Sequence, residues 1–218
     1  KYSCRENRRV DTLKINHGKS EVFNGHGTQC CGDFLRGGTG DGFVEENVEF
    51  ARKQIKNIKW NHDVGFMIYC SFGNGLRLTG DPEYKEVIVE AARSLSTRFR
   101  PVAGIIQSWD VDRGWISERG WECPVIIDNM MNLELLFAAT RLSGDSTFYK
   151  VAVSHVDRTM KEQYRPDGSC YHVVDYSMKD GSVRNRHTTQ GYAHESAWSR
   201  RQAWGIYGLM LCYRETSC

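Results

Sequence analysis

Two aspartates stand directly before apolar segments of the chain and could transfer protons. Asp63 precedes an apolar run that begins at Val64, and Asp128 holds the equivalent place before a second run. An aspartate at a helix start is usually an N-cap, which accepts hydrogen bonds from unpaired backbone N–H groups. Two such residues at matching positions of a repeat are also consistent with acid–base chemistry, in which carboxyl groups donate and accept protons. Both interpretations stay open at this point.

A third polar cluster, His194-Glu195-Ser196, precedes the last apolar segment and is followed by Trp198 and Arg200. An arginine can bind a uronate carboxylate through two parallel hydrogen bonds, and tryptophan faces can stack on sugar rings. Together with the two aspartates, this cluster suits carbohydrate chemistry. Ordinary structural roles remain as alternatives for the residues concerned: a core position for Trp198 and Trp204, a solvated charge for Arg200 and Arg201, and a surface position for His172.

Helices must position these clusters, and the chain repeats one type of helix junction. Gly80-Asp81 and Gly144-Asp145 each follow an apolar segment and precede an amphipathic one. At such a junction the glycine ends one helix in the left-handed conformation, and the aspartate caps the next helix. A weaker copy occurs at Thr39-Gly40-Asp41.

The repeat predicts alternating inner and outer helices. The segments before the two clear junctions, 64–78 and 129–142, are apolar nearly all round, and a third such helix is expected at 196–214. A buried helix followed by an amphipathic one is typical of an α/α toroid or solenoid, with a plain helical bundle as the alternative. In a toroid the inner helices run parallel, so their N-termini meet at one end. The partial positive charge there suits an anionic ligand.

The remaining segments define the expected domain organisation. Residues 1–42 have no apolar period and are expected to be irregular or disordered, whereas 43–218 form the partial toroid domain. One small β-hairpin is expected from 170–176 and 182–187, around a turn at Gly181. The third inner helix approaches another junction where the sequence ends. We therefore expect an all-α, toroid-type fold that is incomplete in this chain and leaves apolar helix faces exposed.

Composition excludes several classes of partner. Lysine and arginine total 29 against 27 acidic residues, a net charge of +2, and no basic run is interleaved with aromatics. A nucleic-acid partner is therefore not expected. No apolar run reaches the roughly eighteen residues of a membrane span, and the start lacks a secretory signal's apolar core. We expect a soluble protein, cytoplasmic or periplasmic, with the compartment left open.

The cysteines do not indicate a metal site. Eight are present, without a Cys-x-x-Cys pair or an accompanying histidine set, so no zinc is expected. Cys70, Cys123 and Cys212 lie in apolar segments and are expected to be buried free thiols.

Three longer strings resemble a known family. His62-Asp63-Val64-Gly65-Phe66-Met67, the segment 124–133, and Gln190-Gly191-Tyr192-Ala193 leading to Trp198-Ser199-Arg200-Arg201 closely resemble the unsaturated glucuronyl hydrolases, glycoside hydrolase family 88. The resemblance runs from about residue 47 to residue 216.

The resemblance implies an (α/α)6 barrel and a hydrolase for oligosaccharides with a 4,5-unsaturated uronic acid at the non-reducing end. Such ends are left by lyases acting on glycosaminoglycans, gellan or xanthan. The implied reaction is hydration of a vinyl ether: a carboxylic acid protonates C4, water adds at C5, and the hemiketal collapses. No metal or organic cofactor is implied.

The resemblance also assigns residues. Asp128 matches the family's acid/base and Asp63 its partner carboxylate, an arrangement in which an ionised neighbour and partial burial would raise the pKa of the proton donor. Five residues match positions that line the substrate site: His172, Gln190, Arg200, Trp204 and, by its place in Ser108-Trp109-Asp110, Trp109.

Two departures from the family pattern stand out. Arg201 occurs where family members usually have a small residue, and could crowd the site or add a second cation; His194 replaces an acidic one. In addition, three inner helices of an expected six are visible, so the chain matches the family as a form truncated at both ends.

Three alternatives remain. The chain could instead be an unsaturated rhamnogalacturonyl hydrolase on the same barrel, a non-catalytic remnant that binds acidic sugar, or a helical-repeat interaction protein. The preferred polysaccharide and the oligomeric state are left open.

Overall fold

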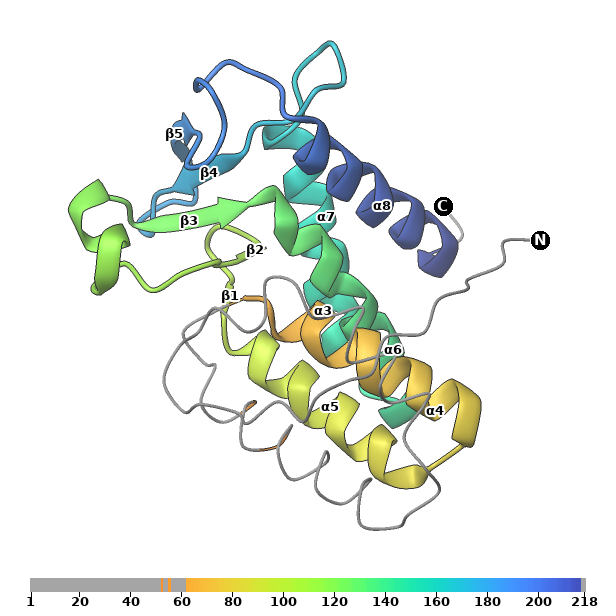
Figure 1. Cartoon of the computed structure of the whole chain (residues 1–218). Helices are drawn as coiled ribbons and strands as arrows, with labels where there is room; N and C mark the ends of the chain where they lie inside the picture. Colours follow the sequence, from red (N-terminus) through yellow and green to blue (C-terminus); the bar gives the residue numbers. More distant parts are fainter. Residues whose placement is uncertain (1–51, 53–54, 56–61, 217–218) are drawn as a thin grey trace, which may run out of the picture.

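The computed structural model describes Arg52, Ile55 and residues 62–216 (Figure 1). The predicted irregular segment 1–42, and with it the weaker junction copy at Thr39-Gly40-Asp41, lies outside the described residues. None of the helices in the described part combines the length and the apolarity needed to cross a membrane.

Both predicted helix junctions are confirmed. Gly80 and Gly144 end their helices in the left-handed conformation, with φ of 73° and 76°. The Asp81 carboxylate accepts a hydrogen bond from Glu83 N at 2.9 Å, and Asp145 caps the second outer helix in the same way. The helices that meet at these junctions are α4 (Asn74–Thr79) with α5 (Pro82–Ser96), and α6 (Leu133–Ser143) with α7 (Ser146–Glu162).

The inner helices are less regular than predicted. The first is divided into α3 (Val64–Ile68), a π-helical turn η2 (Tyr69–Gly73) and α4. The second opens as a 3₁₀ segment, η4 (Ile127–Asn132), which continues directly from strand β3 (Cys123–Ile126). A local 3₁₀ or π turn changes the spacing of hydrogen bonds without changing the apolar pattern, so periodicity alone does not reveal it.

The third inner helix begins later than expected. We predicted a start at residue 196, but α8 spans Ser199–Thr216. The Ser196 hydroxyl instead closes the preceding loop, since it accepts from Ala193 N at 3.1 Å and donates to Ala193 O at 2.8 Å. Such a local bond competes with helix formation and holds His194 and Glu195 outside the helix.

Burial separates the inner helices from the outer ones, as the repeat predicts. α6 is buried on nearly every side, whereas α5 and α7 bury one face each and expose the other. α6 packs against α3, α5, α7 and α8, so it lies at the centre of the main core. The described part of the chain therefore has the alternating arrangement of an incomplete α/α toroid (Figure 1).

Two small antiparallel sheets lie beside the helices. The predicted hairpin is confirmed as β4 (Val173–Tyr176) and β5 (Val183–His187), with Gly181 at φ 73° in its turn. β3 pairs with β4 to make three strands, and a separate pair consists of β1 (Phe99–Arg100) and β2 (Ile105–Ile106). These additional strands were not predicted, because two to four residues carry too short a pattern.

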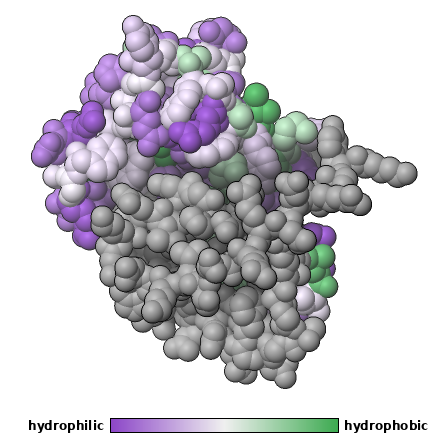
Figure 2. All heavy atoms as spheres, viewed as in Figure 1, coloured by the Kyte–Doolittle hydropathy of each residue, from purple (hydrophilic) through white to green (hydrophobic). Residues whose placement is uncertain are grey.

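One face of α8 is apolar and exposed. Ile206, Met210 and Tyr213 follow one another at helical spacing and are 52%, 65% and 65% exposed. Apolar surface is visible in Figure 2 in the region that α8 occupies in Figure 1. This agrees with the expectation that the chain leaves an inner helix without a complete cover.

Candidate active site

The segment that carries Asp128 is clamped between two helices. η4 packs against α3 on one side and α8 on the other. Glycines permit the close approach, because a Cβ at Gly65 would overlap Asn132, and a Cβ at Gly208 would overlap Met130. The Asn132 side chain also accepts a hydrogen bond from Phe66 N at 3.0 Å. The start of α3 and the middle of α8 are thereby held against η4.

Arg201 lies at the centre of this junction. It is 3% exposed, and its guanidinium forms an ion pair with Asp128 and donates to the Gln190 side chain. Burial lowers the pKa of Arg201 to about 10, and the negative charge of Asp63 opposes that shift. Both candidate carboxylates therefore act on one guanidinium, which brings Asp63 and Asp128 into a common site. From the sequence, Arg201 could crowd the site or add a cation; its ion pair with Asp128 shows that it adds a cation.

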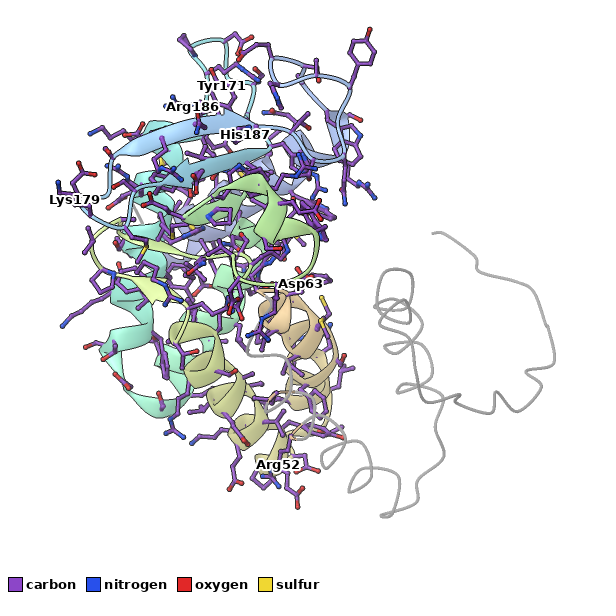
Figure 3. The ribbon with its side chains drawn as sticks, turned by 90° about the vertical axis from the view of Figure 1, so that its left-hand side faces the viewer. Arg52, Asp63, Tyr171, Lys179, Arg186 and His187 are labelled. Carbon is purple, nitrogen blue, oxygen red and sulfur yellow. The ribbon has the colours of Figure 1, made fainter. Side chains whose placement is uncertain are left out.

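Neither carboxylate behaves as a simple helix cap. Asp63 occupies the N-cap position of α3 but makes no capping hydrogen bond, and Asp128 lies inside the first turn of η4. The side chains are 28% and 13% exposed. Figure 3 shows Asp63 near the boundary between the helices and the strands. The capping interpretation of these two residues is therefore not supported by their contacts.

His62 lies between Asp63 and a buried carbonyl. Its Nδ1 donates to Ser108 O at 3.0 Å, which fixes the ring, and its Nε2 lies 3.1 Å from Asp63 Oδ1 without hydrogen-bond alignment. Burial lowers the pKa of His62, with the Asp63 charge opposing. The buried ring therefore lies directly against Asp63. In the sequence, His62 is named only within the string that resembles the family, and its neighbour Asp63 is the available signal for its place in the site.

His172 is buried rather than on the surface. It directly precedes β4, is 6% exposed, and its Nδ1 accepts from Thr189 N at 3.1 Å. Burial and the charge of Arg200 lower its pKa to about 4, so the ring is neutral at pH 7. Because Nδ1 is an acceptor, the ring hydrogen is on Nε2. The ring also meets Trp198 edge-on, with centroids 5.8 Å apart.

The two neighbouring arginines of α8 have different surroundings. Arg200 is exposed, and within the described residues it has no ion-pair partner; its guanidinium lies 4.4 Å from the Trp198 ring centroid and 5.8 Å from that of Trp204. Arg201 approaches the same rings at 4.7 and 5.1 Å but is buried against Asp128. Successive helical residues point about 100° apart, so only one of the two can face η4. The sequence prediction named Arg200, and the structure adds Arg201.

The remaining predicted residues border the same region. Trp109 is half-buried and meets the His62 ring edge-on at 5.5 Å. Gln190 joins through its hydrogen bond with Arg201. Each of the seven predicted residues thus contacts the cluster directly or through one neighbour.

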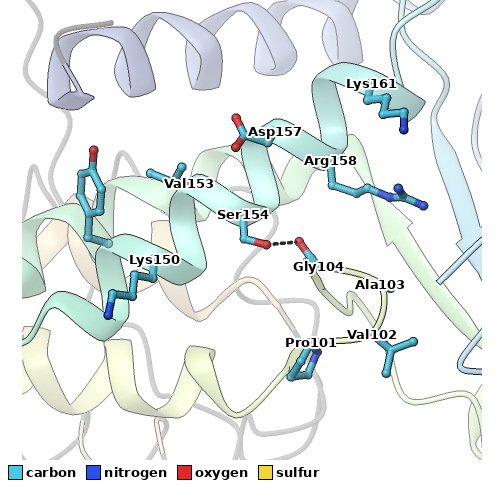
Figure 4. A pocket seen from close by; sticks show the side chains of 11 residues that line it. Pro101, Val102, Ala103, Gly104, Lys150, Val153, Ser154, Asp157, Arg158 and Lys161 are labelled. Carbon is cyan, nitrogen blue, oxygen red and sulfur yellow. Dashed lines mark hydrogen bonds between the residues drawn. The ribbon is translucent and has the colours of Figure 1, made fainter. Parts of the chain in front are cut away.

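No cation site is evident in the described part of the chain. Within it, no group of three or more histidine, cysteine or acidic side chains is placed to hold a metal ion. A groove of about 590 Å³ lies elsewhere, between α7 and the β1–β2 turn, where Ser154 donates to Gly104 O (Figure 4). None of the candidate residues lines it.

Comparisons with known proteins identify relatives of this chain. No protein-family model matches the chain. It is 48% identical over 183 residues to an unsaturated glucuronyl hydrolase of Formosa agariphila, which covers 82% of this chain and 44% of that protein. It is 36% identical over 157 residues to an unsaturated chondroitin disaccharide hydrolase of Streptococcus agalactiae, covering 71% of this chain and 38% of the relative.

A solved structure of the same kind of enzyme also matches the fold of this chain. The crystal structure of an unsaturated glucuronyl hydrolase specific for heparin superimposes with a TM-score of 0.73 and 40% identity, over 88% of this chain and 50% of that one. The chain therefore spans half or less of the length of these relatives.

Proposed function

The chain belongs to the unsaturated glucuronyl hydrolase family, of which it spans about half the length, and from this premise we propose that it carries the acid–base centre of a hydrolase. The substrate is an oligosaccharide, generated by a lyase, with 4,5-unsaturated glucuronic acid at its non-reducing end. The observation that supports this most is the common site of Asp63 and Asp128, both acting on buried Arg201. The names of the relatives favour a glycosaminoglycan fragment.

Asp128 is the proton donor in this proposal. Its carboxyl group protonates C4 of the vinyl ether, and the resulting cation at the ring oxygen and C5 takes up a water molecule. That water loses a proton to the Asp128 carboxylate, which restores the acid. The hemiketal at C5 then opens with release of the remaining sugar. Protons and electrons balance without any cofactor.

The ion pair with Arg201 has to change before this step. A guanidinium in contact with Asp128 stabilises the carboxylate form, which cannot donate a proton. We infer that the substrate's own carboxylate binds the Arg201 guanidinium and replaces Asp128 as its partner. Asp128 then faces the negative charge of Asp63 with less compensation, and the acid form becomes more favourable. In this way substrate binding prepares the proton donor.

The surrounding side chains hold the sugar. Trp198 and Trp204 offer aromatic faces, Arg200 offers a second cation that no described carboxylate occupies, and Gln190 offers an amide once Arg201 moves. His172, neutral at pH 7, presents an Nε2–H donor. This group of residues suits a uronate ring.

The test is a direct assay of the 218-residue chain with the unsaturated chondroitin disaccharide. The ultraviolet absorbance of the conjugated enoate should fall with time, and Asp128→Asn should lower the rate by about 10²–10⁴, the usual contribution of a positioned acid. Lys179→Gln, a change of an exposed side chain in the turn between β4 and β5, serves as the control. Equal rates for wild type and Asp128→Asn would remove Asp128 from the donor role.

A second candidate is favoured by the ion pair itself. A chain in which Asp128 stays paired with Arg201 could bind acidic sugar without hydrolysing it. Calorimetry would then show binding of the disaccharide while the enoate absorbance stays constant. Unsaturated rhamnogalacturonan disaccharide, offered in parallel, distinguishes the pectin-directed alternative by which substrate is consumed.

A further inference from the structure

A cavity lined by two tryptophans adjoins the acid centre and shares Trp109 with it. It measures about 340 Å³ and lies over the 3₁₀ helix η3 (Gly114–Arg119). Its lining consists of Trp109, Asp110, Arg113, Gly114, Trp115 and Ile116. The two indole rings meet edge-on, with centroids 5.5 Å apart at 63°. Trp115 is 49% exposed, so part of its ring is accessible to a ligand.

The cavity connects to the acid centre through a single histidine. Trp109 packs edge-on against the His62 ring at 5.5 Å, and His62 Nε2 lies 3.1 Å from Asp63 Oδ1. Asp63 is therefore at one end of a short row of rings and Trp115 at the other. A chain of sugars that places its first ring at Asp63 and Asp128 can place a later ring against Trp115.

The charges around the cavity are already compensated. Arg113 Nε lies 3.3 Å from Asp112 and 3.6 Å from Asp110, and Asp110 also pairs with the buried Arg98 at 3.1 Å. A sulfate or a second uronate would have to compete with these carboxylates for Arg113. An uncharged pyranose needs no such exchange, because its hydroxyls can bond to both Asp110 and Arg113 while its C–H face stacks on indole.

Neighbouring side chains of η3 and of the adjacent apolar cluster hold Trp115 in place. Its ring meets the buried Trp121 at 6.3 Å, and the Arg119 guanidinium lies over both rings, at 5.5 and 5.6 Å. Ile116, 3% exposed, anchors η3 in the apolar cluster beneath. A platform fixed in this way loses little conformational freedom when a ligand binds.

We propose that Trp115, with Trp109, Asp110 and Arg113, forms a separate sugar-binding subsite for an uncharged pyranose ring beyond the first two units of the oligosaccharide. This inference rests on the proposed function for its direction, since the acid centre determines which end of the sugar chain lies at Asp63.

The kinetic test compares two substrates that share the same unsaturated end. One is the gellan-derived unsaturated tetrasaccharide, whose three following sugars are uncharged, and the other is the corresponding unsaturated disaccharide. Trp115→Ala should raise KM for the tetrasaccharide roughly five- to tenfold, the effect of losing one aromatic contact. KM for the disaccharide should change less than about twofold on the same reasoning. Tyr213→Ala, which removes an exposed aromatic of α8 far from η3, is the matched control and should leave both values unchanged.

A binding test separates this inference from the proposed function. The tetrasaccharide with a saturated terminal uronate cannot react, and calorimetry measures its affinity for wild type and for Trp115→Ala. Weaker binding by the variant supports the subsite even if the wild-type chain hydrolyses nothing, an outcome that would count only against the proposed function. No detectable binding by wild type, the same affinity for both proteins, or an equal rise in KM for both substrates would overturn the subsite.

Discussion

Arg201 forms an ion pair with Asp128 while only 3% of Arg201 is exposed to solvent. Two charges are thus taken out of water together, at the point where α8 meets η4. Such a pair contributes little net stability, but either charge is costly when its partner is removed. The Arg201–Asp128 ion pair therefore affects both the stability of the site and the protonation of the proposed acid.

A double-mutant cycle should show this link. Arg201→Ala leaves Asp128 as an uncompensated buried carboxylate and should lower the free energy of unfolding by about 3 kcal/mol. The double variant Arg201→Ala/Asp128→Asn removes that lone charge, so it should be more stable than Arg201→Ala alone. Urea unfolding followed by circular dichroism measures both values. If the double variant is no more stable than the single one, the two side chains are not coupled as the contact implies.

His155 should make stability depend on pH. It is fully buried in α7, its Nδ1 accepts from Ile106 N at 3.0 Å, and burial lowers its pKa from 6.5 to about 3. Between these two values the unfolded chain binds a proton that the folded chain does not, so the free energy of unfolding falls as the pH falls. The loss should approach about 1.4 kcal/mol per pH unit for this one group.

The variant His155→Gln isolates this contribution. Its side-chain oxygen can still accept from Ile106 N, but it does not titrate. Its stability should therefore fall less steeply than that of wild type between pH 6.5 and 4, as measured by urea unfolding at several pH values. Parallel curves for the two proteins would assign the pH dependence to other groups.

Gly208 should be intolerant of a side chain. A Cβ there would overlap Met130 of η4 and force α8 away from the segment that carries Asp128. Gly208→Ala should cost about 1–3 kcal/mol by overpacking and should lower activity along with stability. Met210→Ala changes the exposed face of the same helix and should stay within about 0.5 kcal/mol of wild type. A Gly208→Ala protein as stable as wild type would show that the close approach is not required.

Asp175 should hold the three-stranded sheet together. Its side chain is fully buried, accepts from Glu122 N and Cys123 N at 3.0 and 2.8 Å, and pairs with Arg184 at 2.6 Å. Arg184→Ala leaves that carboxylate without its cation and should lower the melting temperature by several degrees, since this pair is buried on one side only. Arg184→Lys keeps the charge and should recover part of the loss. Equal melting temperatures for all three proteins would show that the pair adds nothing.

Some features of this protein are determined by the sequence at short range. The junctions at Gly80 and Gly144 were predicted correctly because a left-handed glycine and a following aspartate cap involve only residues within one turn of each other. The β4–β5 hairpin was predicted for the same reason, from alternation around Gly181. The motifs around Asp63 and Asp128 also identified the family, because a match of residue types in sequence order can be recognised without the three-dimensional structure.

The composition of the site was decided by the tertiary structure. Whether Arg200 or Arg201 faces Asp128 depends on the rotation of α8 about its axis, which is set where Gly208 meets Met130, 78 positions earlier in the chain. The burial of His172 depends on the loop at Thr189, and the strand β3 depends on its pairing with β4. These contacts join segments that are distant in sequence, so no local pattern encodes them. Packing between those segments, and not the motif itself, places a cation against the proposed acid.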